Sequence, residues 1–208
     1  MARGTEAMNW LSRIFKQPER DDRKAFIKSI SIDTSGPEFA DLYPTRDAIA
    51  EAISSTGVFK AEDIEWMADI AASQISSGMS FKGPIQEITR SGMLLTPDEL
   101  KARGLNPRRK VGSRFAEAIA VGEIADAIEA LDLALHTETS KANQLHNLRR
   151  MKKIGIEFCE FSGPGGDANL PLEAELTGRR LSIDEAINLV NSRAGDIRRS
   201  AFLAEVKF

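Results

Sequence analysis

The stretch Ile156-Glu157-Phe158-Cys159-Glu160-Phe161 decides the fold class of this 208-residue chain. Apolar and polar side chains alternate along it, which is the period of a half-buried β-strand. Most of the sequence before it instead repeats apolar residues at helical spacing. The sequence therefore predicts an α+β protein that is predominantly α-helical and carries a small C-terminal α+β unit.

The predicted strand follows the longest helical pattern in the chain, from Glu123 to Met151. Its apolar stripe begins at Ile124 and reaches Leu148. Polar residues interrupt the stripe between His136 and Ala142. This interruption predicts either a kink in the helix or a face that a partner covers.

Two further elements follow the strand. Ser182 and Glu185 have the spacing of a capping box, which predicts a short helix through Val190. Residues 201–208 can supply a last strand. Between the strands, Gly163-Pro164-Gly165-Gly166-Asp167 predicts a tight turn.

Before the long helix, the sequence predicts shorter ones. Residues 45–55 and 61–76 repeat apolar residues at helical spacing, and Thr45 can cap the first. Phe81-Lys82-Gly83-Pro84 is expected to begin a connector. Thr96-Pro97-Asp98-Glu99 is the clearest helix start, with an N-cap, a proline at the first position and a capping box.

A basic cluster follows this helix start. Gly104 ends the short helix, and helical periodicity resumes over residues 113–121. Helix, glycine turn, basic cluster and helix have the order of a helix-turn-helix. Candidate contacts for a partner protein or for nucleic acid are therefore Arg108, Arg109, Lys110 and Arg114.

These patterns divide the chain into three parts: a terminal amphipathic helix with a linker (residues 1–24), a helical region (25–151) and a small α+β module (152–208). Residues 1–7 have the character of a leader, because Met8 begins a coherent amphipathic segment. We expect that segment to dock on the body of the protein or on a partner, in preference to the alternative of attachment to a membrane surface, because it is one short helix with few basic residues.

Composition excludes several classes of protein. The net charge of −3 gives no global attraction to nucleic acid or to anionic lipid. The single cysteine, Cys159, permits no internal disulfide, which is typical of a cytoplasmic protein. One cysteine and two histidines argue against a structural zinc site. No apolar run approaches the ~18 residues of a membrane span.

Catalytic patterns are equally scarce. The two histidines, His136 and His146, are turned by roughly 280° about a common helix axis, so they share no face. Cys159 has no histidine near it in the sequence, so we expect a neutral thiol rather than a nucleophile. The glycine-rich turn lacks the lysine and the hydroxyl of a P-loop, and Asp167 would repel a phosphate. We therefore expect no catalytic residue, no metal and no cofactor.

The C-terminal quarter also resembles a known module. The features that carry the resemblance follow one another along the chain. They are a helix end at Leu148–Met151, the strand, the loop Gly163–Asp167, the sequence Leu176-Thr177-Gly178-Arg179-Arg180, the Asp184-Glu185-Ala186 cap and a final strand. This order resembles the carboxy-terminal module of phage head-morphogenesis (minor capsid) proteins. The resemblance implies a structural role. The cysteines that this family often carries are absent, since Ala168–Pro171 and Arg198-Arg199-Ser200 stand at those places.

The sequence thus favours a non-enzymatic, cytoplasmic structural or protein-interaction protein, of phage or prophage origin. One alternative is a nucleic-acid-binding protein that uses residues 96–121. Another is an enzyme with a small-ligand site at the loop formed by Gly163, Gly165, Gly166 and Asp167. The oligomeric state stays open.

Overall fold

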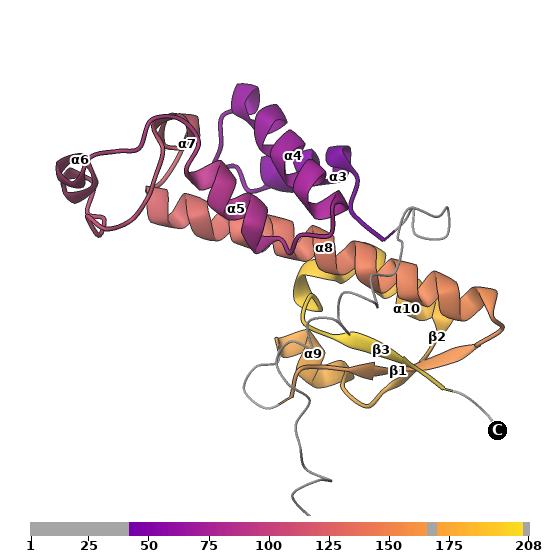
Figure 1. Cartoon of the computed structure of the whole chain (residues 1–208). Helices are drawn as coiled ribbons and strands as arrows, with labels where there is room; N and C mark the ends of the chain where they lie inside the picture. The colour runs from indigo at the N-terminus through magenta and orange to yellow at the C-terminus, as the bar shows by residue number, and fades with distance from the viewer. Residues whose placement is uncertain (1–41, 166–169, 206–208) are drawn as a thin grey trace, which may run out of the picture. The chain divides into compact units, whose positions relative to one another are not determined.

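The computed structural model describes residues 42–165 and 170–205, all within a compact unit that extends from Phe39 to Phe208. As the sequence predicts, this part of the chain is predominantly α-helical and carries a small antiparallel sheet near its C-terminal end (Figure 1). The expected terminal helix and linker lie outside the described residues. So do Gly166, Asp167 and the last three residues of the expected final strand.

The first two described helices confirm the predicted bounds closely. Helix α3 covers Arg46–Ser55, and Thr45 caps it by accepting the Ala48 N–H at 3.2 Å. Helix α4 covers Ala61–Ser76. The two helices pack against each other through fully buried side chains, which include Ile49, Ile53, Met67 and Ala71.

Helix α5 (Lys82–Thr89) replaces the expected connector. Gly83 and Pro84 favour a turn by local propensity, but Pro84 lies in the first helical turn, where its missing N–H has no helical partner to lose. Burial of Ile85 and Ile88 against the helical core then stabilises the helix.

Helices α6 (Pro97–Ala102) and α7 (Ser113–Ala118) flank the basic cluster. The predicted capping box at Thr96 is confirmed. Glu99 Oε2 accepts the Thr96 N–H at 2.7 Å, and Thr96 Oγ1 accepts the Glu99 N–H at 3.3 Å. However, residues 103–112 separate the two helices, whereas a helix-turn-helix joins its helices by three or four residues. The segment therefore does not have helix-turn-helix geometry.

Helix α8 (Ile124–Lys153) is helical at every residue, including those between His136 and Ala142. The polar interruption therefore causes no break in the helix. The other predicted explanation, a face that a partner covers, stays a prediction. The first half of α8 contributes Leu131 and Leu135 to the core formed with α3–α7. Its second half contributes Leu145 and Leu148 to a separate C-terminal core.

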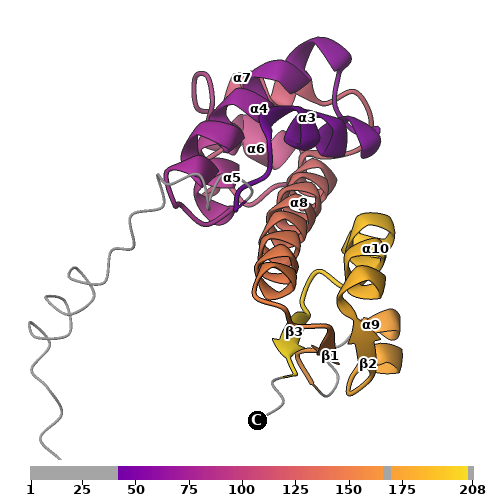
Figure 2. The same cartoon turned by 90° about the vertical axis from the view of Figure 1, so that its right-hand side faces the viewer.

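The C-terminal core is formed by the predicted α+β unit together with the second half of α8 (Figure 2). Strand β1 (Phe158–Ser162) is central in the order β2-β1-β3, and both neighbours are antiparallel to it. Its buried face carries Cys159 and Phe161, while Glu160 is exposed. The remaining elements are α9 (Pro171–Leu176), β2 (Arg180–Ser182), α10 (Ile183–Arg193), the 3₁₀-helix η3 (Ala194–Asp196) and β3 (Ala201–Ala204).

Strand β2 was not predicted from the sequence, because three residues show too little alternation to be recognised. None of the helices in the described ranges combines the length and the apolar character that crossing a bilayer requires.

Candidate interaction surfaces

Two backbone segments cross closely beside the basic cluster. The Gly112 N–H donates to the Thr89 carbonyl at 2.9 Å, and the Ser113 N–H donates to the Met93 carbonyl at 2.8 Å. The Leu95 N–H donates in turn to the Val111 carbonyl at 2.8 Å. These hydrogen bonds fix residues 93–95 alongside residues 111–113.

The loop that carries the basic residues is held at both ends. Leu105 and Val111 are buried, so the residues between them form an exposed turn. Within it, Asn106 Oδ1 accepts the Arg108 N–H at 2.9 Å, and the Asn106 carbonyl accepts the Arg109 N–H at 2.9 Å. Asparagine followed by proline is a typical start for such a turn. The turn thereby presents its basic side chains to solvent.

Charge in this region is of one sign. Every charged residue from Lys101 to Arg114 is basic. Within the described part of the chain, Arg108, Arg109 and Lys110 take part in no ion pair, whereas several basic residues elsewhere, such as Lys152 and Arg180, are paired at 2.6 Å. This surface is therefore free to attract a negatively charged partner.

Arg114 does not extend this free surface. Its guanidinium carbon lies 4.2 Å from the ring centroid of Trp66, which is a cation–π contact. The indole N–H of Trp66 donates to Asp63 at 3.1 Å. The structure thus brings Arg108, Arg109 and Lys110 together on one turn and places Arg114 in a packing contact on helix α4.

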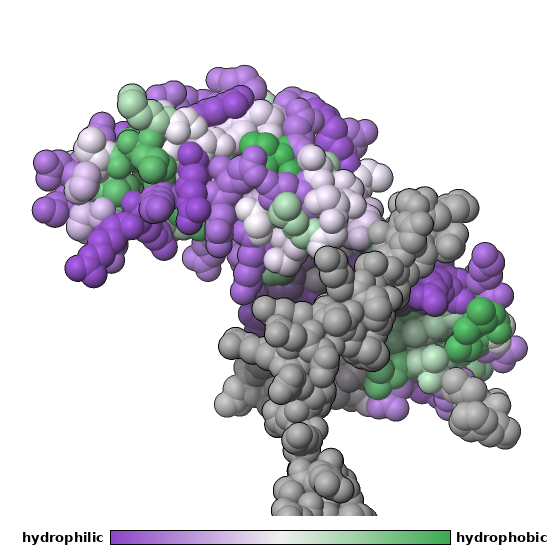
Figure 3. Space-filling model, in the orientation of Figure 1, coloured by the Kyte–Doolittle hydropathy of each residue, from purple (hydrophilic) through white to green (hydrophobic). Residues whose placement is uncertain are grey.

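Two apolar side chains stand beside the basic turn. Met93 is 80% exposed and Leu94 is 49% exposed, although both lie on the segment that pairs with residues 111–113. In the view of Figure 3, apolar surface bordered by hydrophilic side chains is visible at the end of the molecule that carries α6 and α7. We refer to Met93, Leu94, Arg108, Arg109 and Lys110 together as the basic tip.

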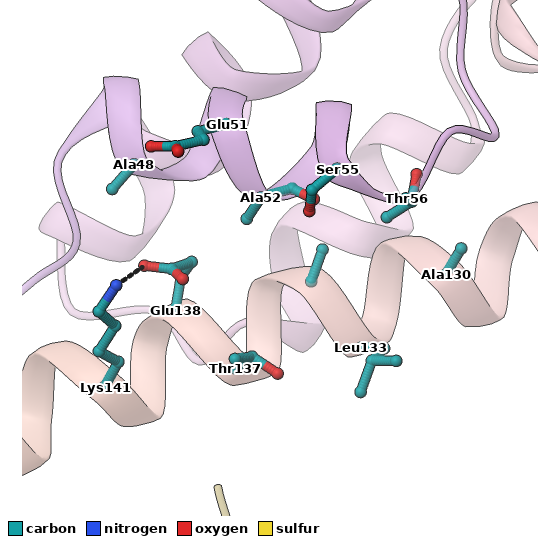
Figure 4. Close-up of a pocket in the computed structure, with 11 residues that line it drawn as sticks. Ala48, Glu51, Ala52, Ser55, Thr56, Ala130, Leu133, Thr137, Glu138 and Lys141 are labelled. Atoms are coloured by element: carbon teal, nitrogen blue, oxygen red, sulfur yellow. Dashed lines mark hydrogen bonds and ion pairs between the residues drawn. The ribbon is translucent and has the colours of Figure 1, made fainter. Parts of the chain in front are cut away.

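A second surface feature is a groove of about 540 Å³ between helices α3 and α8 (Figure 4). Small side chains on both helices leave this space open, and Leu133, which is 47% exposed, adds apolar area to it. The small side chains are those of Ala48, Ala52, Ala130 and Ala134.

The groove is acidic at one end. Glu138 rises from α8 toward α3, and Glu51 stands on α3 nearby (Figure 4). The side chain of Glu138 is only 14% exposed, and its nearest basic partner, Lys141, lies 3.8 Å away. Burial, with a smaller contribution from Glu51, raises the pKa of Glu138 above its ordinary value, while Lys141 opposes the shift. The carboxylate is thus partly desolvated and only loosely paired.

The glycine-rich loop is described only in part. The Gly163 N–H donates to Thr177 Oγ1 at 3.3 Å, and Gly165 has a φ of +88°, a conformation that favours glycine. The first donor of the loop is therefore used within the protein, which accords with a turn after the strand. Gly166 and Asp167 lie outside the described residues.

The remaining candidate side chains, one cysteine and two histidines, are buried or packed against other side chains. Cys159 is fully buried, and burial raises the pKa of its thiol to about 11, so it is protonated at neutral pH. His136 stacks on Phe81 with ring centroids 4.6 Å apart, whereas His146 is almost fully buried. Burial and nearby Arg198 lower the pKa of His136. In the ranges that the structure describes, no cluster of three or more metal-binding side chains occurs.

Sequence reasoning did not find the groove, because its walls come from residues 48–56 and 130–141. One local signal pointed toward it: the polar interruption in the apolar stripe of α8 contains Thr137 and Glu138. Comparisons with protein-family models, with curated proteins and with solved structures found no match.

Proposed function

We propose that this chain is a non-enzymatic interaction protein that binds a partner protein with its basic tip. The observation that carries this proposal is that exposed Met93 and Leu94 lie on the segment whose backbone pairs with residues 111–113. These residues directly follow Arg108, Arg109 and Lys110, which are exposed and take part in no ion pair within the described part of the chain. Contiguous exposed apolar surface that polar residues border is typical of a protein–protein contact.

The tip favours protein over nucleic acid as the partner. A phosphate backbone would satisfy Arg108, Arg109 and Lys110, but it offers no apolar surface to Met93 and Leu94. An acidic protein surface with an apolar centre satisfies both kinds of side chain at once. The separation of α6 from α7 also removes the helix arrangement on which major-groove reading would depend.

The resemblance to phage head-morphogenesis proteins adds a context to this proposal. It is supported by the order α8, β1, loop, α10 and β3, which follows the order of elements that the resemblance implies, with α9 and β2 lying between the loop and α10. We therefore propose that the interaction belongs to a structural assembly of phage or prophage origin in the cytoplasm.

Affinity purification of the full chain from its native host tests the proposal. The wild type is compared with the variant Met93→Asp/Leu94→Asp and with the variant Arg108→Ala/Arg109→Ala/Lys110→Ala. The variant Arg150→Ala/Lys153→Ala, which removes exposed basic residues at the end of α8, is the matched control. We expect both tip variants, but not the control, to lose the same co-purifying proteins.

Nucleic acid is tested in parallel by titrating labelled duplex DNA and single-stranded RNA at several salt concentrations. Strongly salt-dependent binding that requires Arg108 and Arg109 but tolerates Met93→Asp would replace the proposal by the nucleic-acid alternative. Identical sets of co-purifying proteins for the wild type and both tip variants would contradict the proposal itself.

A further inference from the structure

We propose that the partner of the basic tip is a second copy of this chain, whose α3–α8 groove receives the tip. This inference rests on the proposed function, because it names the partner of the same tip. It is carried by a match, in both charge and polarity, between two exposed features of one chain.

The charges of the two features are opposite. The tip carries Arg108, Arg109 and Lys110, which have no ion-pair partner within the described part of the chain. The groove carries Glu51, which is exposed, and Glu138, whose side chain is largely buried with its nearest cation 3.8 Å away. Cations brought to this end of the groove would provide the charge compensation that Lys141 provides only loosely.

Polarity is matched as well. The groove is opened by four alanine side chains and bordered by Leu133, so it offers apolar walls and space. The tip offers Met93, a flexible side chain that adapts to irregular apolar spaces. Leu94, the next residue of the tip, is also about half exposed. Insertion would remove both side chains from water, which is favourable for apolar surface.

Within one chain, Met93 remains 80% exposed, so the tip does not occupy the groove of its own copy. Tip and groove lie on different elements and are not the same surface. A contact between them is therefore heterologous, and it leaves one free tip and one free groove after every addition. The inference thus predicts open-ended, concentration-dependent assembly rather than a symmetric dimer, unless the repeated contact closes into a ring.

Analytical ultracentrifugation of the full chain tests this inference. We expect the average mass of the wild type to rise with concentration at low salt, about 50 mM, and to fall at about 500 mM, where charges are screened. The tip variant Arg108→Glu/Arg109→Glu/Lys110→Glu and the groove variant Glu51→Lys/Glu138→Gln should each remain monomeric. The exposed residue Glu62 lies on α4 outside the groove, so Glu62→Lys is the matched control and should assemble like the wild type.

Mixing the two assembly-deficient variants gives the decisive readout. The tip variant retains a groove and the groove variant retains a tip, so an equimolar mixture should form a dimer that cannot grow further. Because Glu138 is largely buried, the exposed substitution Glu51→Lys is also tested alone. We expect it to weaken association at least about tenfold, through like-charge repulsion with the tip.

Two results would overturn the inference. One is a folded wild type that stays monomeric at low salt across all concentrations. The other is assembly that neither the tip variant nor the groove variant alters. In either case, the proposed function would still stand if the tip variants lose their co-purifying proteins, so the two failures are distinguishable.

Discussion

Gly112 passes so close to Ser91 that a Cβ atom on Gly112 would lie 2.0 Å from the Ser91 carbonyl oxygen. The same atom would lie 2.7 Å from the carbonyl carbon of Arg90. No side chain can move aside to relieve these contacts, because the atoms belong to the backbone. The φ of Gly112 is −89°, so space rather than backbone conformation demands glycine here.

We therefore predict that Gly112→Ala separates the two crossing segments and lowers the free energy of unfolding by about 3 kcal/mol. Urea unfolding followed by circular dichroism measures this change. Gly195→Ala, where a Cβ atom meets nothing within 4 Å and φ is not positive, should be nearly neutral. Gly104→Ala meets no atom either, but its φ of +69° should cost about 1 kcal/mol. Equal stabilities for Gly112→Ala and Gly195→Ala would contradict the close crossing.

Glu173 ties the start of α9 to the turn before β3. The residue is fully buried, and its two carboxyl oxygens accept the N–H groups of Leu170 and Arg199, each at 2.8 Å. We predict that Glu173→Ala lowers the free energy of unfolding by about 2–4 kcal/mol, because two partly buried N–H groups lose their acceptor and a fully buried side chain is removed. Glu173→Gln keeps one accepting oxygen and should cost less.

Thermal unfolding of these variants checks the prediction. The matched control is Glu175→Ala, on the same helix, whose exposed side chain reaches Arg179 only at 4.0 Å. We expect the control to change stability by less than about 0.5 kcal/mol. If Glu173→Ala and the control had the same melting temperature, the buried carboxylate would have no structural role.

Short-range signals explain which features the sequence could predict. The capping boxes at Thr96 and Ser182 involve residues three apart, so their hydrogen bonds follow from local sequence. Helix α4 was also predictable, because its apolar stripe is regular over sixteen residues. The role of Glu173 was not predictable, because its second partner, Arg199, is 26 residues away. The groove between α3 and α8 depends on even longer-range packing.

Ser182 and Glu185 give a prediction for the start of α10. Ser182 Oγ accepts the Glu185 N–H at 3.2 Å, and Glu185 Oε2 accepts the N–H and the O–H of Ser182 at 2.8 and 2.7 Å. The hydrogen bond from the Ser182 hydroxyl lowers the pKa of Glu185 most, and the one from the Ser182 backbone N–H lowers it further. We predict that Ser182→Ala raises this pKa toward 4.5, which carboxyl chemical shifts in an NMR titration would report.

The sign of the pH effect on this cap follows from the lowered pKa. The stabilisation is present above the ordinary pKa of the carboxyl and is lost as the pH falls through the lowered, folded-state value. Loss of the Ser182 N-cap itself should cost about 1 kcal/mol at neutral pH. Ser192→Ala, in the same helix, is the control, since its hydroxyl donates back to the Asn188 and Leu189 carbonyls of that helix, at 2.8 and 3.4 Å. An unchanged Glu185 titration in Ser182→Ala would refute the capping box.

The buried thiol of Cys159 leads us to predict that the folded protein loses stability at alkaline pH. Burial raises the pKa of its thiol from 9.0 to about 11 in the folded protein. In the unfolded chain the thiol ionises near its ordinary value, so between these two values the folded state binds more protons than the unfolded state. The contribution of Cys159 to stability should therefore fall as the pH rises from about 9 toward about 11.

Comparison with Cys159→Ala isolates this effect from the other groups that titrate in the same range. We expect the difference in the free energy of unfolding between the wild type and Cys159→Ala to be constant below pH 8.5 and to shift against the wild type above it. Modification by an aromatic disulfide reagent at pH 8 should be slow in the folded protein and fast in urea, because the thiol is buried and protonated. Rapid modification of the folded chain at pH 8 would place the thiol at the surface and contradict its position on the buried face of β1.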